Sequence, residues 1–225
     1  MQRACGAPSA ARQRSSPTMM SRPRTDLRYS IIGADVVCLD LTTSRYFLLQ
    51  GAAAEAFKAA TLGTATCGQL RWLVENNLVE AGPPVPAPRL APRPETSAFD
   101  NCLGSASPWT LVEALAEQWR ARRSLARQSL GAILKPSSLS RGDLDRCQST
   151  AAAFVRAWRY RNATDQCLVR SIAMRAMLAR RGLGSDLVIG VMLPFSAHCW
   201  IQVGAAVLSD PLDLVVNYQP LLTVR

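Results

Sequence analysis

The feature that most limits how this chain can fold is a run of prolines near its middle. The segment PPVPAPRLAPRP carries six prolines between Pro83 and Pro94. Proline fixes φ and lacks a backbone N–H, so such a run interrupts helices and central strands and favours an extended polyproline conformation. We therefore expect residues 83–106 to be a linker. The 12 residues of its proline-rich segment alone would separate two modules by up to about 37 Å, at ~3.1 Å per residue.

The parts on either side of the linker predict an α+β protein with a small first module and a larger second one. A length of 225 residues suits one ordinary domain plus a small one. Residues 1–25 contain five arginines before the first acid, Asp26, and we expect them to form a basic disordered tail. The expected modules are residues 26–82 and residues 107–225.

Neither the tail nor any later segment predicts export or membrane insertion. The tail lacks the apolar run of about 7 to 15 residues that a secretory signal needs, and no segment approaches the ~20 apolar residues of a membrane span. Seven cysteines without a CxxC spacing, beside a single histidine, make a disulfide framework or a zinc site a poor interpretation. We expect a soluble cytoplasmic protein with reduced thiols, no membrane contact, no metal and no cofactor.

The first module is expected to contain short strands followed by two helices. Residues 29–49 are rich in β-branched and aromatic residues and contain turn signals at 33–35 and 42–44. One helix is expected between Gly51 and Gly63. A second helix is expected over about 66–76, with an apolar face formed by Leu70, Leu73 and Val74.

The second module is expected to begin with helices and to end with strands. Ser107 and Pro108 suit an N-cap and a first helical position. Apolar residues at helical spacing, including Trp109, Val112 and Trp119, are expected to face the core. Further helices are expected over 144–158 and 167–181, and strands over 186–193, 198–203 and from Val207 to Asp210.

Three residues of the second module form a candidate nucleophile, base and orienting group. Cys167 begins a helix, His198 begins a strand, and Asp210 ends the next strand. A thiol at a helix N-terminus faces the positive end of the macrodipole and unpaired N–H groups, which favour the thiolate. The backbone N–H of Cys167 is a candidate oxyanion donor. Because side chains alternate along a strand, Cys199 should point away from the histidine.

Strand register decides whether the aspartate can join the other two residues. A two-residue turn at 204–205 would pair Asp210 with Cys199, on the wrong face of the strand. A three-residue loop would pair it with Trp200, diagonal to the histidine. We predict the longer loop or a bulge. In the two-residue register Asp210 would leave the group, and Asp213 would become the candidate.

Several motifs in order resemble the transglutaminase-like peptidase of lasso peptide biosynthesis, the B protein. They are a CLxRS helix start, an ARRGL helix end, an LVIGV strand, PF-x-AH-x-W around the histidine and a closing aspartate, all between Asp165 and Asp210. More weakly, residues 29 to about 80 are similar to the RiPP recognition element, a small winged-helix domain that binds the leaders of ribosomally made peptides. The resemblance implies a papain/transglutaminase-like cysteine peptidase domain fused to such an element.

The resemblance also implies a reaction and its partners. The protein would remove the leader from a lasso peptide precursor, so that a separate asparagine-synthetase-like cyclase can use the freed core N-terminus to form a macrolactam. By position, Cys167 would attack the scissile carbonyl, His198 would act as base and then acid, and Asp210 would orient His198. Arg170 and Ser171 match the motif, and their role is either structural or functional.

The recognition element would bind the leader as an added strand beside its last strand, against the second helix. The residues expected at that surface are Arg45, Tyr46, Phe47, Leu70, Leu73 and Val74; core packing is the other interpretation of the last three. The linker would then raise the effective substrate concentration at the peptidase. One departure from the family pattern is Cys199, which stands where a small residue such as alanine is typical.

Three other functions remain open from the sequence. A transglutaminase-type acyltransferase forms the same thioester but passes it to an amine. A non-catalytic leader-binding scaffold would keep the fold with an inactive site. A basic winged-helix regulator would bind DNA, but the net charge of +10 is not arranged as a basic stripe interleaved with aromatic residues, and we expect no nucleic-acid partner.

Overall fold

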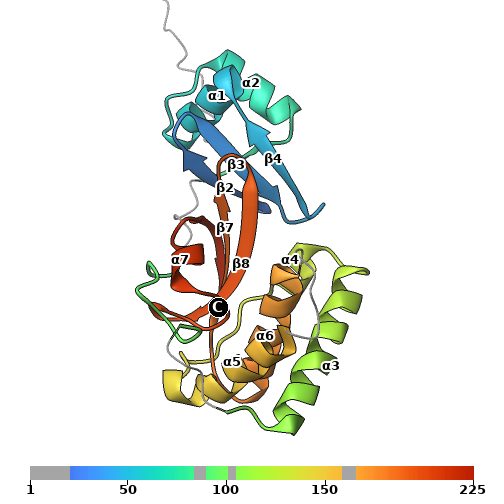
Figure 1. Ribbon diagram of the computed structural model, residues 1–225. Coiled ribbons are helices and arrows are strands. Elements are labelled where there is room, and N and C mark those ends of the chain that lie inside the picture. Colours follow the sequence, from blue (N-terminus) through green and yellow to red (C-terminus); the bar gives the residue numbers. More distant parts are fainter. Residues whose placement is uncertain (1–20, 84–89, 101–104, 159–165) are drawn as a thin grey trace, which may run out of the picture.

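A computed structural model of the chain describes residues 21–83, 90–100, 105–158 and 166–225. The described residues form an N-terminal unit, 21–83, and a C-terminal unit, 90–225. Figure 1 shows the N-terminal sheet lying across the ends of β7 and β8 of the C-terminal unit. The two units are therefore packed against each other.

The N-terminal unit is built on an antiparallel meander with strand order β2-β3-β4. Its elements are β1 (Ser21–Pro23), β2 (Leu27–Ile32), β3 (Asp35–Asp40), β4 (Arg45–Leu49), α1 (Gly51–Thr61), α2 (Cys67–Glu75) and β5 (Val79–Ala81). The predicted strands and helices are confirmed to within a few residues. Thr66 begins α2 with a capping box that includes Gln69, the local signal expected at a helix start.

The N-terminal boundary of this unit differs from the prediction. Residues 21–25, which the sequence assigned to a disordered tail, include β1, and β1 pairs with β5. Arg24 forms ion pairs with Asp26 and Asp40, and these pairs hold the segment against the meander. Residues 1–20 lie outside the described part of the chain. The winged-helix assignment of this unit stays a prediction.

Strand β3 buries side chains on both of its faces. Val36 and Cys38 pack with α1 and α2, whereas Val37 and Leu39 belong to the core of the C-terminal unit. Alternation along a strand sends successive side chains to opposite faces, so a strand that is apolar at four consecutive positions must be covered on both. The meander is thus a layer between two cores. This direct contact corrects the expectation of two modules held apart by an extended spacer.

The C-terminal unit has a five-stranded sheet with order β10-β7-β8-β9-β6. Helix α6 packs on β7 and β8, α3 and α5 pack against α6 on that side of the sheet, and α7 lies on the other side (Figure 1). The elements in chain order are β6 (Thr96–Ser97), α3 (Pro108–Leu125), α4 (Leu130–Ile133), α5 (Leu144–Trp158), α6 (Cys167–Arg180), β7 (Asp186–Met192), β8 (Ser196–Val203), β9 (Ala206–Val207), α7 (Leu212–Val215) and β10 (Gln219–Val224). This mixture of helix and strand confirms the predicted α+β content.

Residues 90–100, which the sequence assigned to the linker, pack along this sheet and contribute the edge strand β6 to it. Strand β6 pairs in parallel with β9. The backbone N–H of Ala91 donates to Thr223 Oγ1 at 2.9 Å, and Gln202 Nε2 donates to the carbonyl of Pro92 at 2.9 Å. Pro92 and Pro94 precede β6 in irregular chain, so neither of them has to donate a ladder hydrogen bond. Residues 84–89 and 101–104 of the expected linker lie outside the described part.

Helix α3 buries a different face from the one predicted. Trp109, Val112 and Trp119 are 82%, 56% and 51% exposed. The buried side chains are Ala114, Glu117, Gln118 and Ala121. Ala114 and Ala121 are small enough for close packing, and Glu117 is buried by its ion pair with Arg180 of α6. Close packing and this ion pair, more than apolarity, decided the buried side of the helix.

Candidate active site

The thiol of Cys167 lies at the first residue of α6, where the helix meets the open edge of β8. Strand β9 pairs only with the last two residues of β8, so the edge beside His198 and Cys199 is left for α6. Burial alone would raise the pKa of the Cys167 thiol. Hydrogen bonding with His198 and with the backbone N–H groups of Cys199 and Leu168 outweighs it, and the pKa is lowered from the ordinary value.

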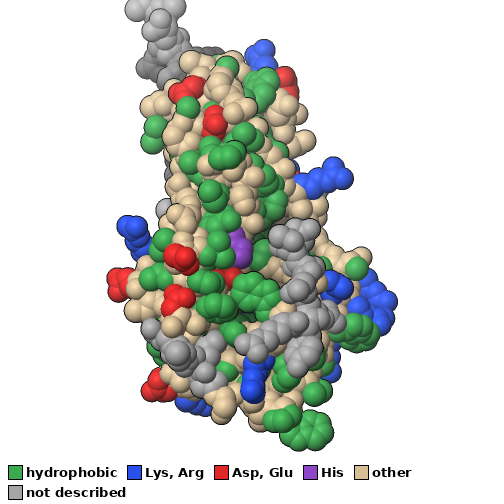
Figure 2. Space-filling model, in the orientation of Figure 1, with side chains coloured by type: hydrophobic (Ala, Val, Ile, Leu, Met, Phe, Trp, Pro, Cys, Tyr) green, Lys and Arg blue, Asp and Glu red, His purple; other side chains and the backbone are tan. Residues whose placement is uncertain are grey.

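The imidazole of His198 is held between aromatic rings and a carboxylate. Its ring centroid lies 5.3 Å from that of Tyr218 and 6.3 Å from that of Trp200. The neighbouring strand offers Gly190 on this face, where a Cβ would come within 2.8 Å of Trp200 and of Tyr218 Cβ. Nε2 of His198 lies 3.2 Å from Oδ1 of Asp210. Figure 2 shows the chain's single histidine at the surface, among apolar side chains.

His198 and Cys167 have pKa shifts of opposite direction. Burial would lower the pKa of His198, but its contacts with Asp210 and with Cys167 raise it to about 9. A raised imidazole pKa and a lowered thiol pKa both favour a thiolate beside an imidazolium at neutral pH. This is the charge state that an attacking thiol requires.

Asp210 is completely buried, and both of its carboxylate oxygens are engaged. Oδ1 accepts a hydrogen bond from Nη2 of Arg170 and faces His198. Oδ2 accepts a hydrogen bond from Ser209 Oγ. Burial would raise the pKa of this carboxyl, but His198, Arg170 and Ser209 together lower it from its ordinary value. The backbone carbonyl of Asp210 also accepts from Ser97 Oγ at 2.7 Å, which fixes the segment. The aspartate is thus ionised and held in place.

The strand register leading to Asp210 differs from the prediction. The turn between β8 and β9 has two residues, with Val203 opposite Ala206 and Gln202 opposite Val207. The predicted three-residue loop is therefore wrong. The expected consequence, that Asp210 would leave the group in this register, is wrong as well.

The chain leaves the ladder just before Asp210. Leu208 N–H still donates to the Ile201 carbonyl at 2.8 Å, but the Ile201 N–H donates to the hydroxyl of Ser209 at 2.9 Å in place of a backbone carbonyl. After this substitution the backbone bends, and the carboxylate turns toward His198. Asp213, the alternative candidate, is an exposed residue in the first turn of α7.

Arg170, Ser171 and Cys199 have separate places around the site. Arg170 is buried behind Asp210, with its Cζ 4.5 Å from the ring centroid of Trp158. Ser171 Oγ donates to the Cys199 carbonyl at 3.0 Å and ties α6 to β8. Cys199 packs in the core beneath β8, facing away from His198 as predicted. Sequence reasoning did not recognise the Arg170–Asp210 pair, although Arg170 follows Cys167 by three residues and shares its helix face.

The expected peptide-binding residues are distributed over two surfaces and a core. Within the described part of the chain, strand β4 pairs with β3 alone, so its other edge carries no strand. Arg45 is exposed there, but Tyr46 packs on the core of the C-terminal unit, with its ring centroid 5.5 Å from that of Phe195. Burial, with Cys199 and Cys167 nearby, raises the pKa of the Tyr46 phenol.

The helix side of this expected surface needs a correction. Leu73 is fully buried in the core of the N-terminal unit, so it cannot contact a docked peptide. Leu70 and Phe47 are partly buried against the same core. Val74 is 50% exposed and remains accessible. Core packing is therefore the correct interpretation of Leu73.

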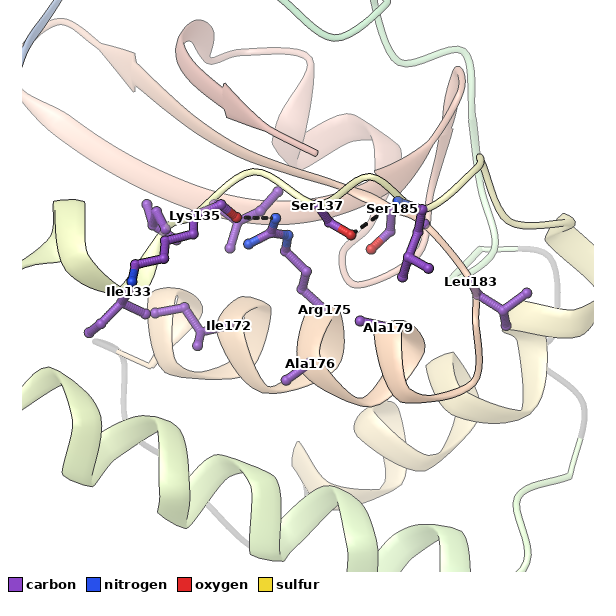
Figure 3. Close-up of a pocket in the computed structure, with 13 residues that line it drawn as sticks. Ile133, Lys135, Ser137, Ile172, Arg175, Ala176, Ala179, Leu183 and Ser185 are labelled. Atoms are coloured by element: carbon purple, nitrogen blue, oxygen red, sulfur yellow. Dashed lines mark hydrogen bonds between the residues drawn. The ribbon is translucent and has the colours of Figure 1, made fainter. Parts of the chain in front are cut away.

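A cavity of about 230 Å³ lies on another face of α6 (Figure 3). Ile172, Arg175 and Ala176 line it from the helix, and neither Cys167 nor His198 does. Arg175 donates to the carbonyls of Lys135 and Arg225 at 2.7 and 2.6 Å. This helix face is thus separate from the one that carries the thiol.

Within the described residues, no group of three or more His, Cys, Asp or Glu side chains is placed to hold a metal ion. The described helices include none with the length and apolar character needed to cross a bilayer.

A thiol, an imidazole and a carboxylate in successive contact form the arrangement of a cysteine-dependent acyl-transfer enzyme. A family model for the transglutaminase-like superfamily matches residues 86–223, which is more than half of the chain. The chain therefore belongs to the transglutaminase-like superfamily, whose members are typically cysteine-dependent enzymes and include peptidases and acyltransferases. The match begins before β6, in agreement with the place of residues 90–100 in the sheet. Searches of curated proteins and of solved structures found no match.

Proposed function

We propose that this protein is a cysteine peptidase that removes the leader from a ribosomally synthesised lasso peptide precursor in the cytoplasm. The observation that carries the proposal is the contact of Cys167 with His198 and of His198 with Asp210 at the open edge of β8. The CLxRS and PF-x-AH-x-W motifs around the first two residues support the choice of substrate class.

The proposed reaction has two halves that share one thioester. The Cys167 thiolate attacks the carbonyl of the last leader residue, and the His198 imidazolium gives its proton to the departing core amine. Neutral His198 then takes a proton from water, and the resulting hydroxide cleaves the thioester to release the leader carboxylate and the thiol. The N–H of Cys167 lies in the first turn of α6, where backbone N–H groups have no acceptor within the helix. It is therefore a candidate donor to the oxyanion.

The open edge of β4 is the proposed docking site of the leader, which would add to the meander as a further strand. Tyr46 of β4 lies against Phe195, in the turn that leads into β8 and His198. A peptide seated on β4 would therefore be delivered close to the thiol by a fixed surface, and a loose tether is not needed. Arg45 and Val74 are the accessible candidates among the expected contact residues.

The freed amine of the core is the nucleophile that a macrolactam-forming cyclase requires. The proposed partner is therefore an asparagine-synthetase-like cyclase that acts on the product.

The test is to incubate the purified full chain with its precursor and to follow free leader and core by mass spectrometry. Cleavage with uptake of water supports a peptidase. Transfer of the leader to an added amine, without hydrolysis, would identify an acyltransferase. Neither product, with the Cys167 thiol unreactive, would identify a scaffold.

A further inference from the structure

The guanidinium of Arg170 is a buried charge within the candidate site. It lies one helical turn after Cys167, is only 9% exposed, and pairs with Oδ1 of Asp210. The same oxygen lies 3.2 Å from Nε2 of His198. The indole of Trp158 covers the guanidinium, 4.5 Å from ring centroid to Cζ. One carboxylate oxygen is therefore shared by two cations.

The charges of this cluster balance only when the arginine is counted. Thiolate and carboxylate contribute two negative charges, and imidazolium and guanidinium contribute two positive ones. Burial raises the pKa of the nearby Cys199 and Tyr46, so both stay neutral. Without Arg170, the described residues of the site would hold one uncompensated negative charge in a buried setting, where charge is costly.

We propose that Arg170 is a positioning residue that keeps Asp210 ionised and directed at His198, and that neutralises the thiolate–imidazolium–carboxylate group. It acts through Asp210 and touches no reacting atom. The inference rests on the proposed catalytic roles of Cys167 and His198, and it does not depend on which peptide is cleaved.

Among the described residues, several titratable groups surround the imidazole and the thiol, and Arg170 is the one permanent cation. From the packed elements of the described structure these groups are Cys167 and Arg170 of α6, Cys199 of β8, Asp210, Tyr218 ahead of β10 and Tyr46 of β4. Removal of a positive charge raises the pKa of every neighbouring acid, and at these short separations a shift of about one pH unit or more is expected. The thiolate should therefore form at higher pH in a variant that lacks the charge.

The experiment measures alkylation of Cys167 by iodoacetamide as a function of pH, with peptide mapping to follow that thiol alone. Arg170→Met should move the midpoint upward by about one unit and slow alkylation about tenfold at pH values well below the wild-type midpoint. Arg170→Lys keeps the charge and should restore most of the wild-type midpoint. Arg175→Met is the matched control: it removes a half-buried arginine of the same helix that faces the cavity of Figure 3, and the midpoint should not move.

A merely structural arginine predicts a different pattern. Arg170→Met would then lower stability or the reactive fraction while the midpoint stayed at the wild-type value, and this result would overturn the inference. If Arg170→Met does not fold, Arg170→Gln removes the same charge and retains a donor to Asp210. A wild-type Cys167 without preferential reactivity would instead count against the proposed function, so the two failures are distinguishable.

Discussion

Two cysteines occupy regions of opposite chemistry at strand β8, Cys167 beside the strand and Cys199 within it. At its open edge, Cys167 meets an imidazole and two backbone donors, and its pKa is lowered. On the buried face, Cys199 is enclosed by the core, and burial raises its pKa well above the ordinary value. Surroundings, and not residue type, decide which thiol becomes a nucleophile. The decisive feature is the early departure of β9, which leaves space at the strand edge for α6 and Asp210.

The largest expected effect is the loss of the nucleophile at the edge. Cys167→Ala should reduce leader removal at least about a thousandfold, because no other group can form the thioester. Cleavage is followed by mass spectrometry of precursor and leader. Cys67→Ala removes an exposed thiol elsewhere and should cleave at the wild-type rate. Substantial cleavage by Cys167→Ala would contradict the assignment.

The next largest effect is expected at Asp210, which the bend after Leu208 brings to the open edge of β8. Asp210→Asn should lower the rate about a hundredfold or more, because the imidazolium loses its buried counter-charge. Asp213→Asn changes an exposed residue of α7 and should leave the rate unchanged. The rates of both variants are compared after circular dichroism has shown that they fold. A reversed order of the two effects would exclude Asp210 as the orienting group.

The pH dependence of cleavage should show the lowered pKa of Cys167 and the raised pKa of His198. Activity should appear below the ordinary thiol pKa as the thiolate forms. It should fall about tenfold within one unit above pH 9, since His198, whose pKa is raised to about 9, loses the proton that the leaving amine needs. Asp210→Asn should move this alkaline limb to lower pH. Activity that keeps rising above pH 9 would mean that the pair is not formed.

The smallest effect is expected on the buried face. Cys199→Ala removes one core atom and should lower the free energy of unfolding by about 1 kcal/mol, measured by urea denaturation. Cleavage should stay within about threefold of wild type, because Cys199 contributes its backbone and not its thiol to the site. A tenfold loss in a stably folded variant would show that the two regions are not separate.

Local patterns predicted most of the elements, including the helix start at Cys167 and the strand that carries His198. The position of Asp210 could not be derived from the sequence, because it depends on the hydroxyl of Ser209 accepting the hydrogen bond of the Ile201 N–H in place of a backbone carbonyl. Counting residues along the strand pair does not predict such a replacement. The unbroken apolar run of β3 did contain the information that both faces are covered. Its partner on the second face is distant in sequence, and the prolines suggested separation instead.

The remaining errors have related causes. Residues 90–100 look like a linker because proline is excluded from central strands, yet Pro92 and Pro94 lie in irregular chain that packs along the sheet before the short edge strand β6. Trp109 and Trp119 correctly indicated a helix, but its buried face is set by packing on α6, where Ala114 and Ala121 fit closely and Glu117 pairs with Arg180. In both cases, contacts between segments that are distant in the sequence decide the structure. Such contacts cannot be predicted from the local pattern of a single sequence.

The most direct test of the central claim compares Cys167 with an exposed thiol of the same chain. Substoichiometric iodoacetamide at pH 7, followed by peptide mapping, reports which cysteine reacts first. Partly buried Cys167 should be labelled ahead of exposed Cys67, and His198→Ala should abolish this preference. Labelling of Cys67 first, or a preference that persists without the imidazole, would contradict the claim that the edge of β8 creates the nucleophile.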